Sequence, residues 1–168
     1  MRRKWTNLAL CLSAFVYIYF LLSLLFFSHR EAGAASSNFV PFREIKRYLF
    51  SENIPVKLAA QNLLGNILLF VPLGIYLRLL FRGRGAAAVI LLTALASALA
   101  EYIQLRLGLG SCDVDDVILN SLGGAAGSAL YSLLRRLTGG GEKLERLIAV
   151  LALLGSGLVV IGWVHWGR

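Results

Sequence analysis

The sequence is short of charged residues. Only 15% of its 168 residues are charged, whereas a typical soluble domain has about 25%. Hydrophobic residues make up 58% of the chain, so almost no polar side chains remain to cover a buried core. An ordinary soluble domain is therefore excluded, and we expect an integral membrane protein.

Cysteine is also scarce, with only two residues. Cys11 falls in the inner half of an apolar segment, whereas Cys112 is expected at the outer surface, so they cannot pair within one chain. Neither has the spacing of a metal site. The sequence carries no known nucleophile or metal motif, and we expect no cofactor. A divalent cation at the aspartates near Cys112 stays an open question.

Five apolar segments predict transmembrane helices. Each approaches or exceeds the roughly 20 residues that cross ~30 Å of hydrocarbon. The expected helices cover residues 5–27, 58–81, 86–105, 115–134 and 147–163. The first is longer than the roughly 7–15-residue core of a signal peptide, so we expect it to be retained despite the cleavage-like run Ala32–Ala34. The predicted fold class is an all-α, multi-pass membrane helix bundle, formed as one domain over residues 1–168.

Basic residues gather at alternate ends of these segments. The three clusters are Arg2, Arg3 and Lys4; Arg78, Arg82 and Arg84; and Arg135, Arg136, Lys143 and Arg146. Because such clusters stay on the cytoplasmic side, we expect a cytoplasmic N-terminus, an external C-terminus and a place in the cell membrane. The net charge of +8 then favours contact with anionic lipid. Nucleic acid is excluded as a partner because the basic charges are divided between two membrane faces.

The loop before the second span contains a short amphipathic pattern. Its apolar face would carry Phe42, Ile45, Tyr48 and Leu49, and its basic face Arg43, Lys46 and Arg47. Pro41 suits a first helical turn. We expect a helix lying on the outer leaflet, with an irregular loop as the alternative.

Polar side chains collect at the predicted outer ends of three spans. Amides there need partners, and ionisable groups inside a membrane usually serve function. Helix capping explains only one of the aspartates, which we expect to be Asp113. The alternatives are asparagines that only join helices and a Glu101–Arg106 surface ion pair. The candidate ligand-binding residues are Asn62, Asn66, Glu101, Gln104, Arg106, Asp113, Asp115, Asp116 and Asn120.

Small residues on the spans expected at 58–81, 86–105 and 115–134 predict close packing of these helices. Such packing would bring their polar ends together. Pro72 removes one backbone hydrogen bond and can bend its helix. The predicted packing residues are Gly65, Pro72, Gly74, Gly123, Gly124 and Gly127.

The motifs of these spans form one combined pattern. It runs from Asn62 to Gly74, continues with Glu101 and Gln104, and ends with the stretch from Asp113 to Gly127. Together these motifs resemble the VanZ-like family of bacterial membrane proteins. The resemblance covers about residues 38–134, including the Val-Pro-Phe segment at 40–42. It implies a role at the cell envelope, because the family's best-known member is associated with low-level resistance to the lipoglycopeptide teicoplanin.

Three functions remain open at this point. The first is binding of an amphipathic envelope molecule, such as a lipid-linked cell-wall precursor or the antibiotic itself, in an external polar pocket. The second is a membrane-embedded enzyme that uses Glu101 and Asp116 as acid–base groups. The third is a lipid transporter or flippase, which the lack of inverted repeats and of midplane charge disfavours.

The predicted topology can be tested with the two natural cysteines. Cys112 should react with a membrane-impermeant maleimide in intact cells, whereas Cys11 should not, because only Cys112 would face outward. Labelling of Cys112 only after cell lysis would invert the topology and place the polar residues in the cytoplasm.

Overall fold

The computed structural model describes residues 2–27, 37–83, 85–109 and 112–166, with the side chains of Arg2, Phe27 and residues 163–166 left out. The run Ala32–Ala34 and the basic residue Arg84 lie outside the described residues. The described helices are α1 (Arg2–Phe27), α2 (Arg43–Phe50), α3 (Val56–Leu80), α4 (Ala86–Leu107), α5 (Val114–Thr138) and α6 (Gly141–Trp166).

The predicted all-α membrane architecture is confirmed. Within the described residues, five helices are long and apolar enough to cross a membrane, and they correspond to the five expected spans. Most of them extend beyond the apolar segments that predicted them, and α6 begins six residues early, at Gly141. A helix continues past its apolar part because its backbone hydrogen bonds do not require apolar side chains.

The short helix before α3 is present, but its start differs from expectation. Pro41 lies in the turn that precedes α2, and Phe42 is the N-cap. Ile45 and Tyr48 are half-buried, whereas Arg43, Lys46 and Phe50 are exposed. Half of the predicted apolar face, Ile45 and Tyr48, is therefore turned toward the rest of the protein, because α2 packs against α3, whereas Phe42 and Leu49 are exposed.

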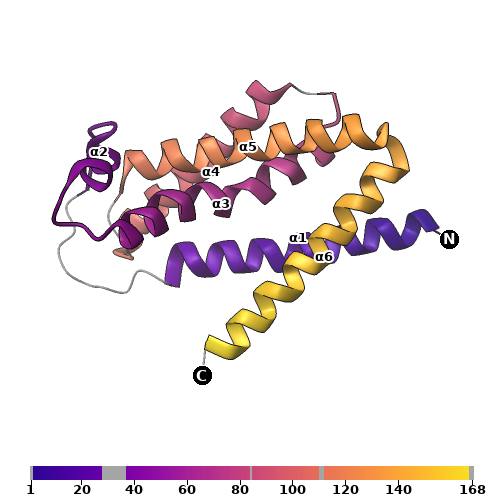
Figure 1. Cartoon of the computed structure of the whole chain (residues 1–168), viewed down its shortest axis with the longest axis horizontal. Helices are drawn as coiled ribbons and strands as arrows, with labels where there is room; N and C mark the ends of the chain where they lie inside the picture. Colours follow the sequence, from indigo (N-terminus) through magenta and orange to yellow (C-terminus); the bar gives the residue numbers. More distant parts are fainter. Residues whose placement is uncertain (1, 28–36, 84, 110–111, 167–168) are drawn as a thin grey trace. The chain divides into compact units, whose positions relative to one another are not determined.

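The chain forms two compact units, and each is described by itself. One unit comprises residues 1–22 and 132–168, and the other comprises residues 23–131. In the first, Gly139, Gly140 and Gly141 all have positive φ in the turn that leads into α6. In the second, α3, α4 and α5 lie side by side, with α2 beyond the end where α3 and α5 begin (Figure 1).

Glycines bring α5 very close to α3. A Cβ atom on Gly127 would collide with the carbonyl oxygen of Val71, and one on Gly123 with that of Ile67. From the other side, a Cβ on Gly74 would collide with the Gly124 carbonyl oxygen. Only glycine permits this backbone approach, which gives van der Waals contact between helices in lipid.

Gly65 is a correction to the predicted packing set. A Cβ atom there would meet nothing within 4 Å, and the residue is exposed. At 100° per residue, the sequence separation of nine between Gly65 and Gly74 places them on opposite sides of α3. Pro72, by contrast, lies inside a continuous α3 beside the Gly127 contact at Val71.

The bundle buries many polar side chains and exposes many apolar ones. On α4, Thr93, Ser97 and Glu101 are all at most 4% exposed, whereas Leu95 and Leu99 are each 58% exposed. A soluble protein shows the reverse arrangement. The apolar surface is suited to lipid, and the buried polar groups bond within the bundle, as Thr93 Oγ1 does to the Val89 carbonyl oxygen at 2.8 Å.

The glycine contact predicts a specific sensitivity. Gly127→Ala should lower the free energy of unfolding by about 1–3 kcal/mol, because the added methyl group meets the rigid backbone of α3. The matched control, Gly65→Ala, adds the same methyl group into open space and should be neutral or stabilising by up to about 1 kcal/mol.

Thermal unfolding of the two purified variants in detergent measures the difference. Equal melting temperatures for Gly127→Ala and Gly65→Ala would show that α3 and α5 do not approach at Gly127.

Candidate functional site

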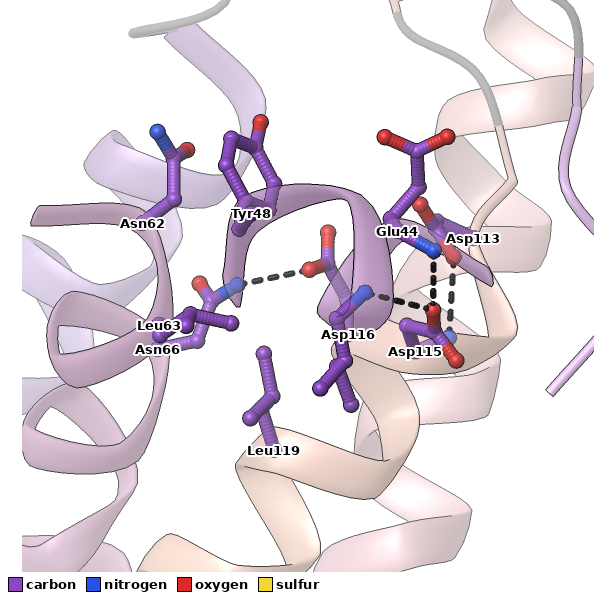
Figure 2. Close-up of a pocket in the computed structure, with 10 residues that line it drawn as sticks. Glu44, Tyr48, Asn62, Leu63, Asn66, Asp113, Asp115, Asp116 and Leu119 are labelled. Atoms are coloured by element: carbon purple, nitrogen blue, oxygen red, sulfur yellow. Dashed lines mark hydrogen bonds between the residues drawn. The ribbon is translucent and has the colours of Figure 1, made fainter. Parts of the chain in front are cut away.

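A hydrogen bond links the start of α5 to α3. The Asn66 amide donates from Nδ2 to Asp116 Oδ1 at 2.6 Å (Figure 2). Asn62, one turn earlier on α3, donates to the Leu58 carbonyl oxygen at 3.0 Å. These residues lie together because i and i+4 share a helix face and because Gly123 and Gly127 bring α5 against α3.

The segment before α2 is attached to the segment before α5. Asn38 donates its backbone N–H to the Cys112 carbonyl oxygen at 2.8 Å and accepts from the Val114 N–H at 3.0 Å. These bonds form an isolated parallel bridge between Asn38 and Asp113. Ser37 Oγ also accepts from the Cys112 N–H at 3.3 Å. Two segments some 75 residues apart in sequence are thereby held together.

Asp113 caps α5, as its position predicts. Its Oδ1 accepts from the Asp115 N–H at 2.8 Å and from Asn38 Nδ2 at 2.9 Å. Its own backbone N–H donates to Glu101 Oε2 at 2.8 Å. Asp113 therefore joins α4, α5 and the segment at Asn38.

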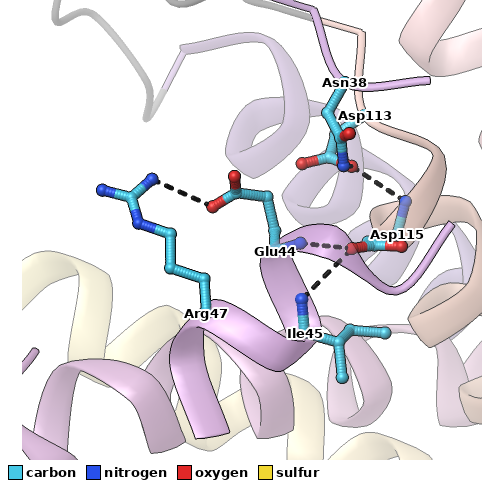
Figure 3. Close-up of polar contacts among 6 residues, drawn as sticks. All are labelled: Asn38, Glu44, Ile45, Arg47, Asp113 and Asp115. Atoms are coloured by element: carbon cyan, nitrogen blue, oxygen red, sulfur yellow. Dashed lines mark hydrogen bonds and ion pairs between the residues drawn. The ribbon is translucent and has the colours of Figure 1, made fainter. Parts of the chain in front are cut away.

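Asp115 caps α2 from a distant part of the chain. Its carboxylate accepts from the backbone N–H groups of Phe42 at 2.5 Å, Glu44 at 2.7 Å and Ile45 at 3.1 Å. Figure 3 shows the Glu44 and Ile45 bonds entering this carboxylate from the first turn of α2. Asp115 is only 1% exposed, so these three donors satisfy a charge that would otherwise be costly to bury.

This cap also explains an unusual backbone angle. Phe42 has φ of 65°, the only positive value among described non-glycine residues. That conformation costs a non-glycine residue about 1–2 kcal/mol, and Phe42 has no capping side chain of its own. Charge-assisted bonds to Asp115 offset the cost, because such bonds are about twice as strong as neutral ones.

These contacts enclose a pocket of about 180 Å³ between α2, α3 and the start of α5 (Figure 2). Four carboxylates line it, together with two amides and the Tyr48 phenol. Apolar side chains complete the wall. The lining residues are Glu44, Ile45, Tyr48, Asn62, Leu63, Asn66, Asp113, Asp115, Asp116 and Leu119.

The pocket is strongly acidic. Burial raises the pKa of Asp113, partly offset by hydrogen bonds from the Asp115 N–H and Asn38, and the neighbouring carboxylates raise it further. Burial, followed by the Glu44 charge, also raises the pKa of Tyr48, which therefore stays a neutral O–H donor. A positively charged group in the pocket would relieve the repulsion among the carboxylates.

The Cys112 thiol lies beside the carboxylates of Glu101 and Asp113. Burial, assisted by the charges of Glu101 and Asp113, raises the pKa of Cys112. Because the thiolate is the reactive form, maleimide labelling of Cys112 is expected to be slower than labelling of a free cysteine.

Five of the nine candidate ligand residues line the pocket, namely Asn62, Asn66, Asp113, Asp115 and Asp116. The other four lie elsewhere. Glu101 is 4% exposed beneath the Asp113 backbone, and Gln104 donates to the Leu25 carbonyl oxygen of α1 at 2.6 Å. Asn120 donates to Ser97 Oγ at 2.8 Å inside the bundle, and Arg106 is exposed.

Sequence reasoning missed the contribution of α2 to the pocket. Glu44, Ile45 and Tyr48 form one wall, and Asn38 holds the preceding segment in place. The amphipathic pattern indicated a helix but assigned its apolar side to the lipid surface. One signal for this contribution was available in the sequence. Capping of α5 requires only one of the three aspartates at its start, and Asp115 is free to cap a second helix, α2.

Comparison with known proteins identifies the family of this chain. The VanZ/LLP1 family model matches residues 14–135, which is most of the chain. The chain belongs to the VanZ/LLP1 family. The match includes α2, α3, α4, nearly all of α5 and every residue of the pocket.

A curated relative also shows similar sequence. Protein VanZ of Enterococcus faecium is 29% identical over 105 residues, which cover 62% of this chain and 65% of that protein. The aligned region thus spans just under two thirds of the relative. No solved structure matches the chain significantly.

The cap predicts that α2 depends on Asp115. Asp115→Ala should release the first turn of α2, because three backbone donors lose their acceptor. Loss of an N-cap costs about 0.5–2 kcal/mol, so α2 should open roughly 2- to 30-fold more often. Hydrogen–deuterium exchange of the peptide covering residues 42–50 measures this opening.

Asp116→Ala is the matched control. It removes the neighbouring carboxylate of α5 without touching an α2 backbone donor, so exchange in residues 42–50 should stay near the wild-type rate. Equal acceleration by both variants would mean that α2 responds to the loss of acidic charge and not to the loss of the cap.

Proposed function

We propose that this VanZ-like membrane protein binds the polar headgroup of an amphipathic cell-envelope molecule in the pocket between α2, α3 and α5. The observation that carries the proposal is an acidic pocket at the ends of membrane-spanning helices. At the end of a membrane-spanning helix, a ligand can place its polar end in the acidic pocket and its apolar end in the surrounding lipid.

The volume of the pocket limits the size of the bound group. Drug-sized ligands occupy about 300–1,000 Å³, and one water takes about 30 Å³. The pocket of about 180 Å³ suits a headgroup or a single substituent and is too small to enclose a whole lipoglycopeptide. If the protein contacts such an antibiotic, only part of the drug enters.

The charge of the pocket indicates the chemistry of that group. Glu44, Asp113 and Asp116 supply carboxylates, and no lysine or arginine is among the described lining residues. Such a lining favours an amine or another hydrogen-bond donor. The Tyr48 hydroxyl and the Asn62 amide, which lies beside it in Figure 2, would contact hydroxyl or carbonyl groups of the same ligand.

The apolar tail would lie outside the pocket, against the helices. On the helices that carry the pocket, Leu64 and Leu68 of α3 are 55% and 65% exposed, and Leu122 of α5 is 52% exposed. A tail outside the pocket would meet an apolar surface of this kind and would replace lipid there.

An enzyme remains the second candidate. Asp116 lines the pocket and is oriented by Asn66 at 2.6 Å, as a general base would need. Glu101, its predicted partner, is instead buried beneath Asp113 and outside the lining. Binding therefore has more support than acid–base chemistry by these two residues.

Native mass spectrometry of the protein released from its own membrane tests the proposal directly. We expect an amine-bearing envelope lipid or lipid-linked precursor to co-purify with wild type and to be lost from Asp116→Asn. Retention of the same lipid by Asp116→Asn would argue against the pocket. A chemically altered form of that lipid made only by wild type would instead favour the enzyme.

The family relationship leads to a prediction about drug tolerance. Expression in a susceptible Gram-positive host should raise tolerance to teicoplanin more than to vancomycin. Teicoplanin carries an acyl chain that partitions into the outer leaflet, at about 0.8 kcal/mol per buried CH₂. Growth inhibition assays at equal protein level measure both effects, and Asp116→Ala should abolish the protection. Equal protection against both drugs would contradict a mechanism at membrane depth.

The Asn66–Asp116 contact predicts that these residues act as one unit. Asn66→Ala and Asp116→Ala should each remove ligand retention or drug tolerance, and the double variant should be no worse than either single variant. Both single variants should reach the membrane at near-normal levels. Loss of the protein itself would indicate that the pair only holds α3 and α5 together.

A further inference from the structure

The face of α2 that points away from the pocket is basic. Glu44, Ile45 and Tyr48 line the pocket, so the opposite side of this two-turn helix carries Arg43, Lys46, Arg47 and Phe50. All four side chains are exposed. Among the described residues, the side chains of Arg43 and Lys46 have no hydrogen-bond or ion-pair partner.

Exposed aromatic and aliphatic side chains flank these cations. Phe39 is 68% exposed, Phe42 51% and Phe50 78%, with Val40 and Leu49 at 58% and 60%. A soluble surface does not gain from this much exposed apolar area beside charge. The combination is typical of helices that lie in the headgroup layer of a bilayer.

The chain connections keep α2 near the membrane boundary. Only Ser51–Pro55 separate α2 from α3, and an extended five-residue linker reaches about 17 Å. Asp115, in the first turn of the membrane-spanning α5, holds the other end of α2. Both ends of α2 are thus fixed to helices that cross the bilayer.

We propose that the basic face of α2 binds the anionic phospholipid surface around the protein. Arg43 and Lys46 would contact lipid phosphates, while Phe42 and Phe50 enter the headgroup layer. Each cation next to an anionic membrane favours binding by about five-fold. This lipid surface is separate from the acidic pocket, and α2 forms the wall between them.

Arg47 connects the two sides of this wall. Its Nη1 lies 3.1 Å from Oε2 of the pocket residue Glu44, and the arginine side chain is 65% exposed (Figure 3). An exposed pair of this kind contributes little stability, so a lipid phosphate can compete for Arg47. Lipid contact would then leave Glu44 unpaired and make the pocket more acidic.

A depth measurement on full-length protein in nanodiscs tests the proposal. Phe50→Cys in a Cys11→Ser/Cys112→Ser background would carry an environment-sensitive fluorophore. Its quenching by a headgroup-labelled lipid and by aqueous iodide would be compared in phosphatidylcholine alone and with added phosphatidylglycerol. We expect phosphatidylglycerol to raise lipid quenching and lower iodide quenching at least about two-fold, an effect that high salt removes.

The triple variant Arg43→Gln/Lys46→Gln/Arg47→Gln should lose this dependence on anionic lipid. Its control, Arg135→Gln/Arg136→Gln, lowers the net positive charge elsewhere and should keep the dependence on anionic lipid.

Two results would overturn the proposal. One is equal quenching in both lipid compositions for the labelled protein with its basic residues intact, and the other is an unchanged response of the triple variant. The proposal would also be overturned if a soluble polyanion, and not anionic lipid, protected the fluorophore from iodide. The basic face would then bind a polyanionic polymer instead of a membrane. If the triple variant does not fold, the salt titration alone decides.

Discussion

The pocket depends on one buried carboxylate that caps a helix from another part of the chain. Asp115 accepts three backbone N–H groups at the start of α2, and no side chain within α2 caps that end. Without this acceptor, the eight-residue α2 would depend on its packing against α3, since isolated helices shorter than about 12–15 residues are marginal in water. One wall of the pocket therefore exists because a residue of α5 stabilises α2.

The remaining contacts follow from the cost of unpaired polar groups near a membrane. Asp113 caps α5 and binds Asn38, while its own N–H bonds to Glu101. The glycines of α5 allow the backbones of α3 and α5 to meet, which brings Asn66 to Asp116. Each buried polar group thus positions the next, and carboxylates are left around a space too small for a large ligand but large enough for a headgroup.

The sequence predicted the parts of this structure that depend on length, polarity and helical period. Five spans, the α5 cap at Asp113 and the shared face of Asn62 and Asn66 all follow from local pattern. The sequence did not predict that α2 turns part of its apolar face toward α3, because such a face suits a lipid surface and a protein surface equally well. Gly65 and Gly74 look alike in sequence, yet only contact with α5 distinguishes them. The bridge at Asn38 pairs two short polar segments that have no strand pattern.

A cysteine pair at Asn38 and Asp113 tests most directly whether the segment before α2 is attached to α5. Bridged residues lie about 4.8 Å apart, within the range of a disulfide. In a Cys11→Ser/Cys112→Ser background, Asn38→Cys/Asp113→Cys should cross-link under mild oxidation in native membranes, and adding Asp115→Ala should lower the yield. The control pair Asn38→Cys/Gly65→Cys should not cross-link, because Gly65 points away from α5. Failure of the first pair to form a disulfide in correctly inserted protein, or equal yields from both pairs, would contradict the attachment on which the pocket depends.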